Sequence, residues 1–186
     1  SNIVMNVKAS MVQDYSKKLK WALMAVAVAG SLLLFSKPRI FYEQADDGYY
    51  VRFYVYGLTN MTTATIPDTY QGEKVVGLRG NTFSNMPFLS EVTLPDSITE
   101  IRGQAFKNCR SLERVTLPEH LTYLGGEAFY HCSSLEEVNL PAGLTEIRGN
   151  TFEECSSLLR IEIPDNVTRI GGHAFYGNTS LEEVVI

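Results

Sequence analysis

The chain has 186 residues, of which 45% are hydrophobic, and a formal net charge of −5. This charge is unevenly distributed, because it is +5 over residues 1–40, −3 over residues 41–93 and −7 over residues 94–186. The acidic C-terminal part argues against nucleic-acid binding, which uses basic stripes. Three cysteines are an odd number, and nothing else in the sequence suggests a disulfide framework.

The first predicted element is an apolar helix over residues 21–35 (WALMAVAVAGSLLLF), within a basic region that covers residues 1–40. A membrane-spanning helix needs about 20 apolar residues, but Lys20 and Lys37 flank this segment and can extend their amino groups to lipid headgroups. We expect a single-pass membrane anchor with the basic N-terminus on the cytoplasmic side. A helix docked to a partner protein and an uncleaved signal peptide are the alternatives.

Residues 41–65 are predicted to form an aromatic β-hairpin that caps the rest of the chain. Asp46-Asp47-Gly48 is a turn signal, and the residues after it alternate as in a strand. We expect one set of side chains to cover the core: Tyr49, Val51, Phe53 and Val55. The other set is expected to face outward, either as ordinary strand surface or in contact with lipid headgroups or a partner: Tyr50, Tyr54 and Tyr56.

From residue 66 onward the sequence is a tandem repeat of five units. Four units of 23 residues align without gaps, and a first unit aligns after a five-residue expansion. The units are 66–93, 94–116, 117–139, 140–162 and 163–185. One unit has too few apolar residues to enclose a core, so we expect the units to stack. Phenylalanine illustrates the apolar columns that would form the core: Phe83, Phe106, Phe129, Phe152 and Phe175.

Each unit contains a short segment of the form L-x-x-V-x-L, at residues 112–117 for example. We predict one strand per unit in this segment, added to a parallel sheet. A proline follows and ends the strand because it cannot donate to the ladder. A recurrent glycine later in the unit predicts a tight turn.

The full pattern is I/L-P-x-x-[VIL]-T-x-I-x-x-x-A/T-F-x-x-C-x-S-L-x-x-V, repeated over residues 66–186. It resembles the leucine-rich repeats of the BspA-like type. The resemblance implies an open, curved solenoid, which we expect to be right-handed, that binds other molecules, often on bacterial or protist surfaces. It implies no catalytic residues, so none is assigned. No pair of histidines has metal-ligand spacing and no Gly-rich phosphate loop appears, so we expect neither a metal nor a cofactor.

One stretch, EAFYHCSSLEEV (127–138), raises the question of thiol chemistry, because His131 precedes Cys132. A catalytic thiol needs a single cysteine of low pKa beside a base. The cysteine position is instead a repeat column, occupied by Met86, Cys109, Cys132, Cys155 and Asn178. We therefore expect a buried packing column and no enzymatic activity. A disulfide between stacked cysteines, about 5 Å apart, is an alternative.

One exposed column alternates in charge from unit to unit: Glu91, Arg114, Glu137, Arg160 and Glu183. Opposite charges on adjacent parallel strands attract each other. We expect these residues, the charge ladder, to neutralise one another and keep the strands in register. A stripe that faces a partner is the alternative, although a charge-balanced column attracts a charged partner poorly.

The chain begins with Ser1 and ends at Ile186, the first apolar position of a further unit. We expect that a segment before Ser1 was removed or left out, and that the array continues or is covered by another chain. These features together predict a non-enzymatic, membrane-anchored subunit of a larger protein complex. Its partners would be other protein subunits, with no small-molecule substrate, in an energy-transducing organelle membrane. The alternative is a cell-surface adhesion or recognition protein.

Overall fold

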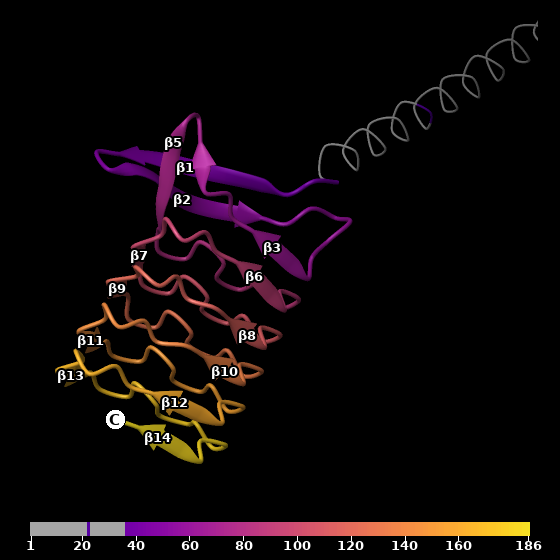
Figure 1. The fold of residues 1–186 in the computed structure, drawn as a ribbon. Coiled ribbons are helices and arrows are strands. Elements are labelled where there is room, and N and C mark those ends of the chain that lie inside the picture. Colours follow the sequence, from indigo (N-terminus) through magenta and orange to yellow (C-terminus); the bar gives the residue numbers. More distant parts are fainter. Residues whose placement is uncertain (1–21, 23–35) are drawn as a thin grey trace, which may run out of the picture.

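The computed structural model describes residue 22 and residues 36–186, which form fourteen β-strands (Figure 1). The apolar segment 21–35, expected to be an anchor helix, lies outside the described residues apart from residue 22. Within the described part of the chain, no helix has the length and apolar character needed to cross a bilayer.

The predicted hairpin is present at the N-terminal end of the described stack. Strands β1 (Arg39–Ala45) and β2 (Gly48–Val55) pair antiparallel around the Asp46–Asp47 turn. Strand β2 then pairs in parallel with β5 (Glu73–Leu78), which also pairs antiparallel with β4 (Thr69–Tyr70). The hairpin therefore lies across the first coil and covers its end (Figure 1).

A β-bulge in the hairpin changes which side chains face the core. Phe41 pairs with Phe53, but Tyr42 pairs with Val51, so Arg52 is the extra residue of β2. An extra residue reverses the alternation of side chains beyond it. Val51 is buried as expected, but Phe53 is 48% exposed. The expectation that Phe53 and Val55 cover the core is therefore wrong, and Tyr54 fills that place.

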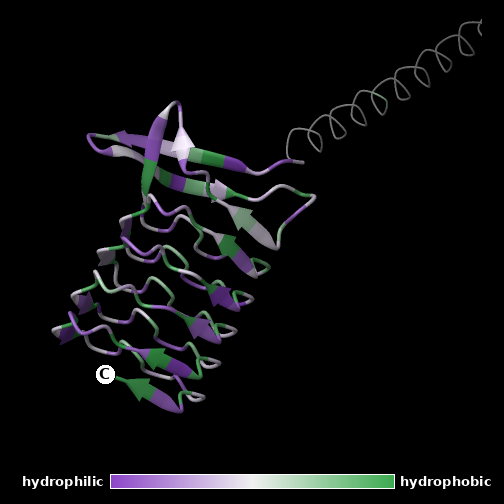
Figure 2. Ribbon diagram, viewed as in Figure 1, coloured by the Kyte–Doolittle hydropathy of each residue, from purple (hydrophilic) through white to green (hydrophobic). Residues whose placement is uncertain are grey.

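The repeats form a solenoid whose coils contribute strands to two sides. One side, the ladder side, is formed by β3 (Thr63–Thr65), β6 (Glu91–Thr93), β8 (Arg114–Val115), β10 (Glu137–Val138), β12 (Arg160–Glu162) and β14 (Glu183–Val185). The second side continues from β5 through β7 (Glu100–Ile101), β9 (Tyr123–Leu124), β11 (Glu146–Ile147) and β13 (Arg169–Ile170). Each coil thus has two short strands, one more than predicted. Hydrophobic and hydrophilic residues alternate within them, as in β12 (Figure 2).

The remaining side of each coil has turns in place of strands, and backbone hydrogen bonds still join the coils there. The amide of Phe106 donates to the carbonyl of Ala128 at 2.8 Å, and that of Phe129 donates to Thr151 at 2.9 Å. Two positions in each of these turns adopt positive φ, Glu127 and His131 in one coil for example.

The core is a continuous stack of aromatic rings with aliphatic side chains around it. Phe83, Phe106, Phe129 and Phe152 are fully buried, and Tyr54 from the hairpin closes the stack against Phe83. The ring centroids of Phe83 and Phe106 are 5.1 Å apart, and so are those of Phe106 and Phe129. The next two spacings, from Phe129 to Phe152 and from Phe152 to Phe175, are 5.5 Å and 5.6 Å. The predicted apolar columns therefore form one core.

The strand ladders are interrupted at one level of the stack. Strands β9 and β11 belong to separate sheets, and so do β10 and β12. At this level the amide of Leu159 still donates to the carbonyl of Glu136, at 3.4 Å, and the turn side keeps its backbone hydrogen bonds. Side chains and turns therefore hold the coils together where the strands do not.

Candidate functional site

The outer face of the ladder side carries two adjoining hollows that no other described element covers. The first has a volume of ≈ 820 Å³ and lies over β6 and β8, and the second has a volume of ≈ 850 Å³ and lies over β10 and β12. Arg114 and Asn139 line both hollows. The two hollows therefore form one shallow groove along the stack, the ladder groove, defined by their lining residues between Ser90 and Asn166.

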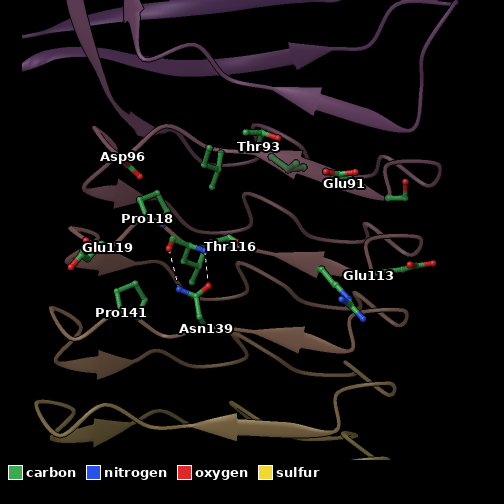
Figure 3. Close-up of a pocket in the computed structure, with 14 residues that line it drawn as sticks. Glu91, Thr93, Asp96, Glu113, Thr116, Pro118, Glu119, Asn139 and Pro141 are labelled. Atoms are coloured by element: carbon green, nitrogen blue, oxygen red, sulfur yellow. Dashed lines mark hydrogen bonds between the residues drawn. The ribbon is translucent and has the colours of Figure 1, made fainter.

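The ladder groove has acidic edges and an uncharged polar floor in its first half. Figure 3 shows Asp96 and Glu119 on one side and Glu91 and Glu113 on the other. The residues between them are Thr93, Thr116 and Asn139. This arrangement follows from the strands, because alternate residues such as Val92 and Val115 point inward and leave their neighbours outward.

At the centre of the groove, the side chain of Asn139 hydrogen-bonds to the backbone of the neighbouring coil. Its Oδ1 accepts a hydrogen bond from the Leu117 amide at 2.8 Å, and its Nδ2 donates to the Leu117 carbonyl at 3.1 Å (Figure 3). At the equivalent place in another coil, the amide of Ile163 donates to the backbone carbonyl of Val185. The Asn139 side chain thus replaces the backbone partner and fixes the floor between the two hollows.

The charge of the groove is strongly negative. Its lining includes eight carboxylates and two guanidinium groups, which gives a formal charge of −6. The acidic residues are Glu91, Asp96, Glu113, Glu119, Glu136, Glu137, Glu162 and Asp165. All eight are exposed, and no group of residues in the described part of the chain is placed to hold a metal ion. The groove therefore offers a surface for a positively charged molecule.

All five residues of the charge ladder are exposed, and they are in register within each of the two sheets on the ladder side. Glu91 pairs with Arg114, and Arg114 pairs with Glu137, on adjacent parallel strands. Arg160 and Glu183 form an ion pair at 2.9 Å. The edges of the groove carry further acids on either side of this ladder, which the sequence analysis did not assign to the same face. The charge balance expected from the ladder does not hold for the groove as a whole, which is negatively charged.

The second strand-bearing side has charges of both signs that contact one another. The guanidinium groups of Arg102 and Arg148 lie over the ring of Tyr123, at 4.6 Å and 4.3 Å from its centre. Arg102 also pairs with Glu100 at 2.9 Å, and Arg148 pairs with Glu146 at 3.3 Å. Tyr123 belongs to β9 and Arg148 follows β11, so this contact crosses the interruption in the ladder.

The structure corrects the expected exposure of the hairpin tyrosines. Tyr50 is 5% exposed and donates a hydrogen bond from its hydroxyl to Glu100 at 3.0 Å, while Arg79 lies over its ring. Burial and this carboxylate raise the pKa of Tyr50 to about 12. A Cβ on Gly77 would lie 2.2 Å from the Tyr50 ring, so glycine makes this burial possible. Tyr54 is also buried, so neither Tyr50 nor Tyr54 presents a surface to lipid or to a partner. Tyr56 is half-buried.

The cysteine column is buried, as predicted. Cys109, Cys132 and Cys155 are free thiols with no exposed surface. The thiol of Cys132 donates to the carbonyl of Phe106 at 3.1 Å, and its neighbours make the same contact one coil away. His131 lies in a turn with its ring stacked on Tyr130. The described contacts of Cys132 therefore provide no base to activate it.

We predict that these thiols make the fold sensitive to alkali. Burial raises the pKa of Cys109 and of Cys155 to about 12, and that of Cys132 well above its ordinary value of 9.0. Unfolded thiols therefore ionise first as the pH rises above 9, so stability present below pH 9 is lost toward pH 12. The free energy of unfolding in guanidinium chloride with reductant, measured at pH 8 and pH 10, checks this.

Cys132→Ala serves as the comparison, because buried tyrosines such as Tyr50 and Tyr54 titrate equally in both proteins. Its loss of stability between the two pH values should be smaller by about 1 kcal/mol, since one raised thiol pKa has been removed. Equal losses in both proteins would contradict the buried, un-ionised thiol.

Apart from the ladder residues such as Glu91, the acidic edges of the groove are the residues that sequence reasoning missed. One edge follows the strand-ending prolines, as in Pro95-Asp96, Pro118-Glu119 and Pro164-Asp165. The other edge precedes the charge ladder at Glu113 and Glu136. Both are visible as columns of the repeat. Their common face becomes evident only when the turn after each proline is placed beside the strand.

The family model for the BspA type leucine-rich repeat region matches residues 76–186 with six copies. A search of curated proteins returned no match. Among solved structures, a leucine-rich repeat protein from Eubacterium ventriosum superimposes with a TM-score of 0.63 at 19% identity, over 78% of this chain and 39% of its own.

Two further solved structures are similar. A leucine-rich cell surface protein from Faecalibacterium prausnitzii has a TM-score of 0.51 and 26% identity, over 78% of this chain and 52% of its own. The leucine-rich repeat protein of T. pallidum has a TM-score of 0.51 and 22% identity, over 77% of this chain and 88% of its own. The chain thus spans about half or less of two of the three solved chains.

Proposed function

Because the chain belongs to the BspA-type leucine-rich repeat family, we propose that it is a non-enzymatic protein that binds other proteins through the ladder groove. The observation that carries this proposal is the groove itself, an open polar surface that runs over consecutive coils. Rigid stacked coils suit such a surface because they hold many side chains in fixed positions along one face. The buried thiol column supports a role other than catalysis.

The finer part of the proposal is that the chain is a structural subunit of a larger membrane complex, with residues 21–35 as its single-pass anchor. Support comes from the sequence, since this stretch contains fifteen consecutive uncharged residues between basic flanks. The hairpin follows a few residues later and would hold the groove near the bilayer.

Extraction of the native protein in mild detergent, followed by native sizing and mass spectrometry, tests this proposal. We expect fixed companion proteins in a large particle. A photo-crosslinking residue in place of Thr116, in the groove, should capture a companion, whereas the same residue in place of Thr122, on the other side of the coil, should not. Migration of the chain alone, or equal crosslinking from both positions, would refute the proposal.

A second candidate function is recognition at the cell surface. The similarity to the leucine-rich cell surface protein of Faecalibacterium prausnitzii favours it. Protease treatment of intact cells distinguishes the two functions. A surface protein would lose its solenoid to the protease, whereas a subunit of an internal membrane would be protected until the cells are opened.

A further inference from the structure

The two strand-bearing sides of the solenoid differ in how their charges are balanced. On the side of Tyr123, arginines are matched by glutamates in ion pairs and by the tyrosine ring. The ladder groove has eight carboxylates against two arginines. Like charges held close together repel one another and destabilise a fold. A cationic partner would remove that repulsion, and the relief of repulsion would favour its binding.

The charge ladder also has a spacing that selects the shape of a partner. Its glutamates recur at every second coil, at Glu91 and Glu137, with Arg114 between them. Adjacent parallel strands are about 4.8 Å apart, so the backbone positions of these two glutamates are about 9.6 Å apart along the groove. A polyproline II helix advances about 9.3 Å in three residues and returns each third side chain to the same face. A β-strand returns side chains to the same face every two residues, about 6.6 Å, which does not match the spacing of the two glutamates.

We propose that the ladder groove binds an extended, polyproline II-like segment of a partner protein with basic residues at every third position. The inference rests on the proposed function and specifies its partner. Basic side chains at positions i and i+3 would face Glu91 and Glu137, and the intervening residues would turn away from Arg114. The acidic edges at Glu113 and Asp96 attract the same segment and keep it along the groove.

The test uses the full chain in non-ionic detergent and a fluorescent peptide, (Lys-Pro-Pro)₄, monitored by fluorescence anisotropy. An isomer with its four lysines contiguous has the same charge and composition. We expect the regular peptide to bind about 5-fold more tightly than this isomer, and binding to weaken as salt rises, because exposed charges are screened. Equal affinity for the two peptides would overturn the spacing argument, and no binding would overturn the proposal.

Matched variants locate the site. Glu91→Gln combined with Glu137→Gln should weaken binding of the regular peptide about 5- to 10-fold, which corresponds to two partly screened ion pairs. The control combines Glu73→Gln with Asp47→Asn, which removes the same charge from exposed positions outside the groove. Equal weakening by both variants would mean that only net charge matters, and would overturn the inference.

Failure of this inference can be distinguished from failure of the proposed function. If companions crosslink to Thr116 but the regular peptide does not bind, the binding function stands and the basic partner is rejected. If the peptide binds at the groove but the native protein has no companions, the chemistry of the groove stands and the complex-subunit function is rejected.

Discussion

Replacement of Phe129 by alanine is expected to lower the free energy of unfolding by about 3–5 kcal/mol, because it removes a fully buried ring and leaves a cavity. The ring stacks between Phe106 at 5.1 Å and Phe152 at 5.5 Å. No other element can fill the space, since every coil already contributes its own phenylalanine to the stack. The stacking of coils depends on such contacts between neighbours.

Guanidinium chloride unfolding followed by circular dichroism measures this effect, with Phe175→Ala as the control. Phe175 occupies the same column but is only partly buried, so its loss should cost much less. Similar losses for both variants would mean that the column is not a continuous core. The comparison is informative because both phenylalanines lie in an Ala-Phe-Tyr sequence and have one ring neighbour in common, Phe152.

The repeat made the core predictable because burial in a solenoid is a property of a column rather than of a single residue. Cys132, taken alone, resembles half of a catalytic pair. Its equivalence to Cys109 and Cys155 in the alignment predicts the buried row that the structure contains. The turn before the hairpin strand was also predictable, because Asp46-Asp47-Gly48 is a local signal.

Features that depend on geometry between elements could not be predicted in this way. The bulge at Arg52 reverses the exposure of Phe53 and Tyr54, and no local residue signals it. The second strand of each coil has only two residues, as in Glu100–Ile101, which is too short for a periodic pattern. The acidic groove combines columns of the ladder strand with the column that follows each proline, and the turn between them decides whether they share a face. Its charge therefore follows from the path of the chain after each proline.

Gly125→Ala is expected to destabilise the protein by about 3 kcal/mol, although it adds a single methyl group. The Cβ would lie 2.2 Å from the amide nitrogen of Gly103 and 2.6 Å from the carbonyl carbon of Arg102. Both atoms belong to the backbone of the neighbouring coil, so the coils themselves must separate. Gly125 also occupies the column of Arg102 and Arg148, and the missing side chain leaves room for both guanidinium groups over Tyr123.

Thermal and denaturant unfolding of Gly125→Ala, compared with Gly172→Ala, tests this close approach. A Cβ on Gly172 has no atom within 4 Å, and its φ is not positive, so alanine there should change stability by less than about 0.5 kcal/mol. Gly171→Ala provides an independent repeat of the effect, because its Cβ would lie 2.4 Å from the amide nitrogen of Gly149. If Gly125→Ala and Gly172→Ala were equally stable, the coils could not approach as closely as the structure places them. A large loss at Gly125 and Gly171 alone would instead show that backbone contact sets the spacing of the coils on this side, and with it the position of the arginines around Tyr123.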